Sequence, residues 1–211
     1  MSLKKDKNRA LGQKVVRALK NRFMDAYFVE TIEEANKLAL SLMPEGSSVG
    51  WGGTMTVDEG GLKDLLRERN YKIIDRDTAA TPEERNQLMI DCLSTDFFLG
   101  SSNAISENGV LFNIDGMGNR LAAMCFGPKN VILICGMNKV CKDEDTALKR
   151  ARNEAAVTNA LRFPGDRPCT EAGTCLNCLK PDTICCQLLV TRMSKIPGRT
   201  KVILVNEDLG L

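Results

Sequence analysis

Four cysteines near the end of the chain have the spacing of a thiolate ligand set. Cys169, Cys175, Cys178 and Cys185 are separated from one another by five, two and six residues. Four thiolates can close a tetrahedral zinc site or hold an iron–sulfur cluster, and a Cys-x-x-Cys pair readily gives two ligands to one ion. Free or oxidised thiols and a redox-active dithiol are the alternatives, although this pair does not follow a predicted strand as a redox dithiol of the thioredoxin type would. The sequence therefore predicts a metal or iron–sulfur site here, with those alternatives open.

Histidine is absent from the 211 residues, which restricts the chemistry that any site can use. Imidazole general bases, histidine-containing nucleophilic triads and histidine-ligated zinc are excluded, so Cys, Asp, Glu, Lys and Tyr must carry proton transfer or ligation. Three further cysteines, Cys92, Cys125 and Cys135, fall at apolar periodic positions. We expect these three thiols to be buried in the core.

The glycine-rich segment 50–54 follows a predicted strand and precedes a predicted helix. Backbone N–H groups that converge at such a junction favour an anion such as phosphate or carboxylate. Gly52, Gly53 and Thr54 are therefore candidate ligand-binding residues, and the alternative is that the glycines only permit a tight turn. The segment lacks the spacing of a dinucleotide fingerprint and the lysine of a P-loop, which argues against nucleotide binding of those two types.

A second polar segment, residues 100–109, follows another predicted strand. Asn103 is a candidate ligand contact. Glu107 is a candidate nucleophile or general base, if its surroundings shift the pKa of its carboxyl suitably. The same polar side chains can instead satisfy the backbone of the loop.

Residues 115–120 contain a carboxylate, an amide and a guanidinium beside two glycines. The glycines would allow a ligand to approach the backbone closely. Asp115, Asn119 and Arg120 are predicted to contact the ligand. The alternative is that Asp115 and Arg120 pair with each other across a hairpin turn.

Apolar periodicity and turn residues indicate the elements that position these side chains. Helices and short apolar strands alternate as far as residue 100, which predicts an α/β fold with a mostly parallel open sheet and helices on both faces. An antiparallel ribbon is predicted around residues 101–126, and a Cys-rich loop over residues 163–186. We expect a single domain, residues 1–211, with an N-terminal helix within residues 1–25.

The charge and hydropathy patterns exclude several classes of partner. Twenty-nine basic and 27 acidic residues leave a formal charge of +2, and no basic stripe interleaved with aromatics is present, so nucleic-acid binding is not expected. No stretch approaches the roughly 18 consecutive apolar residues of a membrane span, and the N-terminal segment is amphipathic. We therefore expect a cytoplasmic protein, whose nine cysteines are reduced.

Several motifs in the middle of the chain resemble those of the lactate-utilisation (LUD) domain family. They are Asn103-Ala104-Ile105, Glu107-x-Gly109, Asp115-Gly116-x-Gly118-Asn119-Arg120, Phe126-Gly127-Pro128 and Gly136-x-Asn138-Lys139-Val140. The Cys-rich tail and the closing segment 198–210 also match the family. The resemblance covers nearly the whole chain, and Lys139 in the last motif completes the set of predicted ligand-binding residues.

The resemblance implies the fold shared by sugar-phosphate isomerases and class I CoA transferases. It also implies a role in bacterial lactate oxidation beside iron–sulfur and flavin-type partner proteins. Residues 106–109, Ser-Glu-Asn-Gly, are similar to the CoA-transferase segment whose glutamate attacks the acyl group and then carries CoA as a thioester. On this resemblance Glu107 is the nucleophile, and Gly52 and Gly53 shape the CoA or oxyanion site. Phe112 stands where CoA transferases tend to have glycine, which argues against a CoA pocket.

The leading hypothesis is a LUD-type component of lactate or related organic-acid metabolism that binds a small anionic metabolite and assembles with redox partners. One alternative is an enzyme of acyl or CoA transfer, or of sugar-phosphate isomerisation, that uses Glu107. Another is a non-catalytic binding or regulatory subunit. The sequence leaves the oligomeric state open, a homo-oligomer included.

Overall fold

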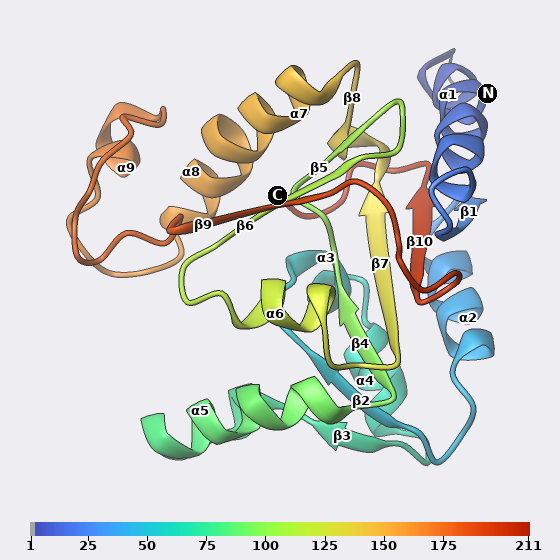
Figure 1. The fold of residues 1–211 in the computed structure, drawn as a ribbon, viewed down its shortest axis with the longest axis horizontal. Helices are drawn as coiled ribbons and strands as arrows, with labels where there is room; N and C mark the ends of the chain where they lie inside the picture. Colours follow the sequence, from blue (N-terminus) through green and yellow to red (C-terminus); the bar gives the residue numbers. More distant parts are fainter. Residues whose placement is uncertain (1–2) are drawn as a thin grey trace.

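The computed structural model describes residues 3–211 and is built around sheet A, which has six parallel strands in the order β1-β10-β7-β4-β2-β3 (Figure 1). The first two residues of the predicted N-terminal region lie outside this range. The strands are β1 (Asp25–Val29), β2 (Ser48–Trp51), β3 (Lys72–Ile74), β4 (Phe97–Gly100), β7 (Asn130–Gly136) and β10 (Thr200–Val205). The most apolar of them, β7 and β10, lie inside the sheet, where both faces of a parallel strand are buried. The predicted mostly parallel sheet is confirmed.

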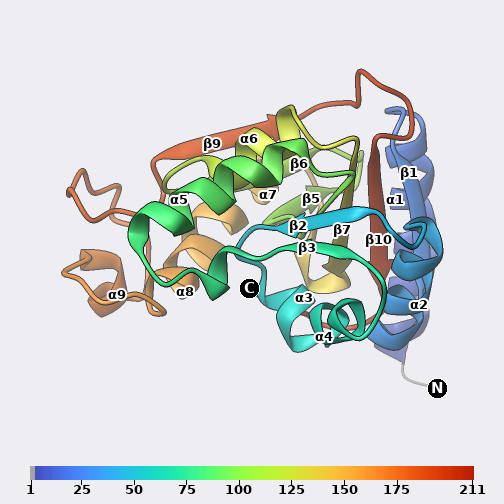
Figure 2. The same ribbon diagram turned by 90° about the horizontal axis from the view of Figure 1, so that it is seen from below.

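Helices cover both faces of sheet A, as predicted (Figure 2). One face packs on α1 (Leu3–Lys20) and α6 (Asn119–Cys125), and the other packs on α2 (Ile32–Leu42), α3 (Met55–Glu59) and α4 (Leu62–Arg67). Alternate side chains of a strand point to opposite faces. In β7, Leu133 accordingly packs with the α1 and α6 side, whereas Ile132 and Ile134 pack with the α2 to α4 side.

A smaller sheet B lies beside sheet A, with its strands in the order β8-β5-β6-β9. Its strands are β5 (Ala104–Ser106), β6 (Leu111–Asp115), β8 (Val140–Cys141) and β9 (Gln187–Thr191). The predicted antiparallel ribbon exists as the β5–β6 pair, but its expected continuation to residue 126 is wrong because that segment forms α6. Gly118, at a φ of 89°, turns the chain into this helix, and Leu121 and Met124 then bury one helical face.

The remaining helices extend from the sheets toward one side of the molecule (Figure 1). They are α5 (Pro82–Asp91), α7 (Glu144–Arg150), a π-helical turn (Ala151–Ala155), α8 (Ala156–Ala160) and α9 (Pro168–Ala172). Three 3-10 turns, Arg76–Thr78, Cys92–Ser94 and Met137–Lys139, connect strands or helices. The α5 helix begins at a capped residue, since the Thr81 hydroxyl accepts a hydrogen bond from Glu84 N at 3.1 Å.

Two of the three cysteines predicted to be in the core are buried. Cys92 and Cys135 are 3% and 0% exposed, whereas Cys125, at the end of α6, is exposed and corrects the prediction for that residue. Cys125 lies three residues after the exposed Ala122, so both side chains are on the solvent-facing side of the helix. Within residues 3–211, no helix combines the length and apolarity required to cross a bilayer.

Candidate functional site

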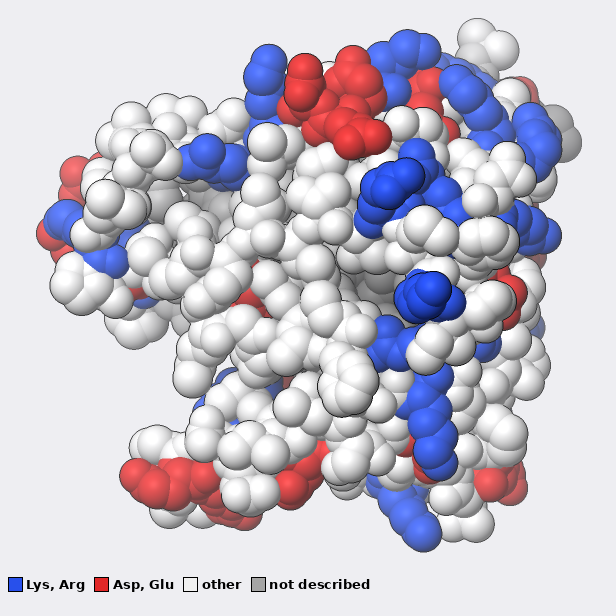
Figure 3. Space-filling model, in the orientation of Figure 1, with Lys and Arg blue, Asp and Glu red and all other residues white. Residues whose placement is uncertain are grey.

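A cavity of about 550 Å³, hereafter the central cavity, opens where β2, β3, β4 and β7 end. The residues that follow these strands and line it include Gly53, Arg76, Ser101 and Lys139. The chain adds β3 on one side of β2 and β4 on the other, so the cavity lies at a topological switch point, where open parallel sheets bind ligands. Residues of α5 and of the end of α8 form its outer walls. Figure 3 shows the surface hollowed above α5, at the lower left.

Seven of the eight predicted ligand-binding residues line the central cavity. They are Gly53, Thr54, Asn103, Asp115, Asn119, Arg120 and Lys139. The eighth, Gly52, packs beneath it, because a Cβ at this position would lie only 3.0 Å from Arg120 Cγ. A Cβ at Gly53 would lie 3.1 Å from Arg76 Nη2. The two glycines thus leave room for two arginine side chains at the cavity, and ligand binding by the set stays a prediction.

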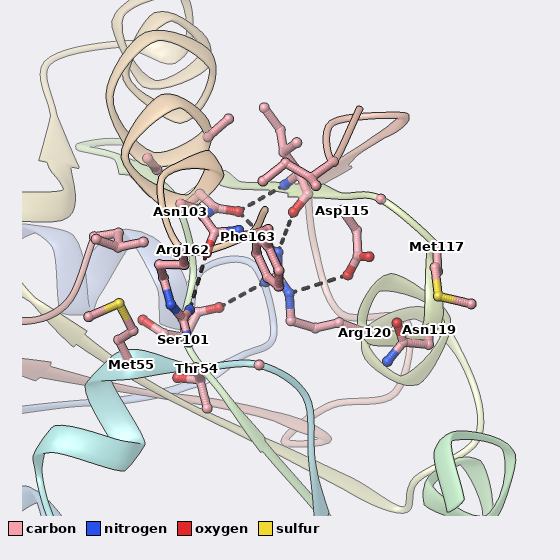
Figure 4. A pocket seen from close by; sticks show the side chains of 18 of the residues that line it. Thr54, Met55, Ser101, Asn103, Asp115, Met117, Asn119, Arg120, Arg162 and Phe163 are labelled. Carbon is pink, nitrogen blue, oxygen red and sulfur yellow. Dashed lines mark hydrogen bonds and ion pairs between the residues drawn. The ribbon is translucent and has the colours of Figure 1, made fainter. Parts of the chain in front are cut away.

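Arg120 organises one wall of the central cavity (Figure 4). It is 9% exposed, and its guanidinium donates to Asn113 Oδ1 at 3.0 Å and to Asn103 Oδ1 at 3.1 Å. Its Nε lies 3.4 Å from Asp115 Oδ2. Burial lowers the pKa of Arg120, and the Asp115 carboxylate opposes that effect. The expected Asp115–Arg120 pair is therefore present, and it lies within the cavity wall.

Lys139 lies at the floor of the same cavity, one turn after β7, and is 3% exposed. Its Nζ donates to Ser101 Oγ at 2.9 Å and to Thr56 Oγ1 at 3.1 Å, and within residues 3–211 it forms no ion pair. Burial lowers the pKa of this amine to about 8. The neutral amine is consequently much more populated here than on an exposed lysine.

Two buried polar atoms at the central cavity have no hydrogen-bond partner among the described residues. They are Thr54 Oγ1 and Arg76 Nε. Thr54 is 5% exposed and precedes α3, yet its hydroxyl does not cap that helix. Leaving a buried polar atom unpaired costs about 1–3 kcal/mol. Arg76 Nε lies 3.8 Å from Asp77 Oδ1, so the Thr54 hydroxyl is the more fully unpaired of the two atoms.

Sequence reasoning missed five polar residues that contribute to this site. They are Thr56, Arg76, Ser101 and, on the outer walls, Arg85 and Arg162. Ser101 and Arg76 carry a sequence signal, since each follows a predicted strand directly. Arg85 and Arg162 carry none, because only the folded chain brings α5 and the end of α8 to the mouth of the cavity.

Glu107 lies elsewhere, in the tight turn between β5 and β6, and does not line the central cavity. Its carboxylate accepts from Lys14 Nζ at 2.5 Å and from Lys142 Nζ at 3.2 Å. These ammonium groups, Lys14 first, lower the pKa of Glu107. Gly109 in the same turn has a φ of 85° and packs on the backbone of α1. The structure thus gives this segment a role in docking α1, and a nucleophilic Glu107 stays a prediction.

The four predicted metal-binding cysteines all line a second cavity, of about 210 Å³, between α8, α9 and β9. It is hereafter called the Cys pocket. Cys169, Cys175 and Cys178 are half-buried, and Cys185 is exposed. Burial raises the pKa of Cys169, and the nearby thiols of Cys178, Cys185 and Cys175 raise it further. As the side chains are placed, no three Cys, Asp or Glu residues within 3–211 are close enough to hold a metal ion. The four thiols share a pocket without forming a closed ligand set.

The sequence and this architecture agree with one protein family. A model of the LUD domain matches residues 12–205 of the chain. The chain belongs to the LUD domain family. This confirms the predicted family, which is associated with lactate utilisation. All eight residues predicted to bind the ligand of this LUD domain lie within the matched range.

One solved structure similar to this LUD domain supports its fold. The crystal structure of a DUF162 family protein from Deinococcus radiodurans matches with a TM-score of 0.54 and 10% identity, over 94% of this chain and 97% of that chain. The structure of eIF2B beta from Chaetomium thermophilum matches more weakly, with a TM-score of 0.40 and 17% identity over 54% of this chain and 44% of that chain. No curated protein sequence matches the chain.

Proposed function

We propose that this LUD domain binds the carboxylate of a small organic acid in the central cavity, as a component of lactate or related organic-acid utilisation. The observation that carries the proposal is that two groups without an acidic or hydrogen-bonding partner of their own line the same cavity. They are the buried amine of Lys139, which has no acidic partner within residues 3–211, and the unpartnered hydroxyl of Thr54, which follow β7 and β2 on either side of β4. A carboxylate accepts hydrogen bonds from hydroxyl, ammonium and guanidinium groups. Because the family is associated with lactate utilisation, lactate and related organic acids are the ligands that we expect.

The charges around the cavity favour an anionic ligand. Five basic side chains line it, those of Arg76, Arg85, Arg120, Lys139 and Arg162, against the three acidic side chains of Asp58, Asp77 and Asp115. Each of these three carboxylates is already paired with a basic side chain. Basic groups in a recessed site attract an anion more strongly than the same groups on an open surface.

Thermal stabilisation of the full chain by L-lactate and pyruvate tests this proposal, because a ligand that binds only the folded state raises the melting temperature. Lactamide, which replaces the carboxylate by a neutral amide, is the matched control and is expected to stabilise far less. Thr54→Val removes one hydroxyl and is expected to weaken lactate or pyruvate binding on the order of tenfold. Thr158→Val, an exposed threonine on α8, is expected to bind as the unmodified chain does. Equal stabilisation by lactamide, or none by either acid, would contradict the proposal.

A second proposal is that Cys169, Cys175, Cys178 and Cys185 bind one thiophilic centre, either zinc or an iron–sulfur cluster. All four residues line the same pocket. Their donor atoms are thiolate sulfurs, which bind both zinc and iron–sulfur clusters. Because the side chains do not yet converge, rotation of half-buried and exposed thiols must accompany binding. A bound cluster would supply electron transfer, whereas zinc would supply only structural support.

Metal content and visible absorption of anaerobically purified protein test the second proposal and separate its two forms. Iron with sulfide and visible absorption indicates a cluster, and colourless protein with one zinc per chain indicates a structural site. Cys178→Ser is expected to abolish stoichiometric metal, whereas Cys125→Ser, an exposed thiol outside the pocket, retains it. Protein that contains neither metal and takes up neither on reconstitution contradicts the proposal.

A further inference from the structure

The environment of Lys139 differs from that of an ordinary anion-binding lysine. Its amine is buried, forms no ion pair within residues 3–211 and contacts two hydroxyl groups. With a pKa of about 8 the amine is mostly protonated at pH 7 and can attract a carboxylate, but about a tenth of it is neutral, far more than on an exposed lysine. Arg76, Arg85 and Arg162 line the same cavity, and guanidinium groups stay charged and suit carboxylates geometrically. The cavity therefore has further cations for an anion, and the neutral fraction of the desolvated Lys139 amine is also a nucleophile.

The charged and titratable groups near Lys139 come from several elements. Cys135 of β7 and Glu59 of α3 raise the pKa of the amine, whereas Arg150 of α7 and Arg120 of α6 lower it. The hydroxyls of Ser101 and Thr56 complete its surroundings. A 3-10 turn that directly follows β7 fixes the backbone of Lys139. The amine is thus held at one position on the floor of the cavity.

We propose that Lys139 Nζ forms a reversible imine with the carbonyl carbon of a 2-oxo acid bound in the central cavity. This inference rests on the proposed binding of an organic acid there. A 2-hydroxy acid such as lactate has the same carboxylate but no carbonyl carbon, so it binds without a covalent bond. The cavity consequently distinguishes the oxidised member of a hydroxy acid and oxo acid pair from the reduced one.

The reaction balances without any oxidant or reductant. The lone pair of the neutral amine attacks the carbonyl carbon, and the electron pair of the C=O double bond moves to oxygen, which takes up a proton. Nitrogen loses a proton, and the carbinolamine then expels water to give the C=N bond. Ser101 Oγ and Thr56 Oγ1, at 2.9 and 3.1 Å from Nζ, are positioned to pass these protons. Hydrolysis reverses the sequence and releases the acid.

Reductive trapping tests the inference on the full chain. Pyruvate with cyanoborohydride is expected to add one carboxyethyl group per chain, and peptide mapping is expected to place it on Lys139. At neutral pH the neutral fraction of this amine exceeds that of an exposed lysine on the order of a hundredfold, so labelling is expected to be selective. Lactate in place of pyruvate gives no adduct. Lys139→Arg removes the adduct, whereas Lys142→Arg, at an exposed lysine, retains it.

The pH profile separates an imine-forming amine from a merely structural one. Trapping at Lys139 is expected to rise from about pH 6 and to level off above about pH 8, whereas labelling of exposed lysines continues to rise toward about pH 10. Ser101→Ala is expected to slow trapping severalfold and to leave the site of the adduct unchanged.

Failure of the inference and failure of the proposed function give different results. If pyruvate and lactate both stabilise the chain but cyanoborohydride labels no lysine, or labels exposed lysines as much as Lys139, the imine is overturned and acid binding stands. If neither acid stabilises the chain and no adduct forms, both are overturned. A pyruvate adduct on Lys139 of the unmodified chain supports both.

Discussion

In the central cavity Lys139 and Arg120 are almost fully buried and each makes at least two hydrogen bonds, whereas in the Cys pocket three thiols are half-buried and Cys185 is exposed. The cavity takes its residues from the ends of four parallel strands and from the helices packed beside them, which are far apart in sequence. The pocket takes its cysteines from one segment of 17 residues, of which only α9 is regular. Side chains at strand ends are held in position before any ligand binds. Side chains on a loop reach their final positions only when the ligand binds.

The largest expected difference between the two regions is in stability. Arg120→Met leaves Asp115, Asn103 and Asn113 without their buried donor and is expected to lower the free energy of unfolding by about 3–5 kcal/mol. Arg152→Met removes an exposed guanidinium that bonds Asn177 at the Cys pocket, and is expected to change it by less than about 0.5 kcal/mol. Urea unfolding of both variants measures the difference. Equal losses would show that the Cys pocket is as ordered as the cavity.

A smaller effect of opposite sign is expected at the floor of the cavity. Lys139→Met removes a desolvated amine and is expected to raise the free energy of unfolding at pH 7 by about 2 kcal/mol. Because the amine has a lower pKa folded than unfolded, the unfolded chain binds more protons between about pH 8 and 10, so the unmodified protein gains stability as pH rises through that range. Urea unfolding at pH 7 and pH 10 should therefore show the advantage of the variant shrinking. A variant that is less stable than the unmodified protein at both pH values would mean that Lys139 stabilises the folded state.

The smallest effect is expected at Glu107, which belongs to neither region. Glu107→Gln loses the pairs with Lys14 and Lys142 and is expected to cost at most about 1 kcal/mol at pH 7. These pairs lower the pKa of the carboxyl, so their stabilisation is present above the unfolded pKa and is lost as pH falls through the folded one. Unfolding at pH 7 and at about pH 3, with lactate binding as the second measurement, checks this. Loss of acid binding in this variant would return Glu107 to the functional site.

The elements of the main sheet could be predicted because each has a local signature. Apolar runs such as residues 131–135 and the cap and proline at Thr81 and Pro82 appear in the sequence as they do in the structure. The predicted ribbon is wrong over residues 119–125, where the structure has α6, since Gly-rich turns precede hairpins and helices alike. The prediction that Cys125 is buried is wrong for a related reason, because an apolar run does not show which of its residues face solvent once it forms a helix.

The sequence by itself determined the family, the parallel α/β fold, the absence of histidine chemistry and the thiol spacing of the Cys pocket, because each is encoded in residue types at short range. Only the tertiary structure decided that Lys139 shares a cavity with Thr54 and Arg120 while Glu107 does not. The order of strands decides which strand ends meet, and it depends on crossovers that no local pattern specifies. The tertiary structure likewise decided the protonation of Lys139, because desolvation depends on everything packed around the amine.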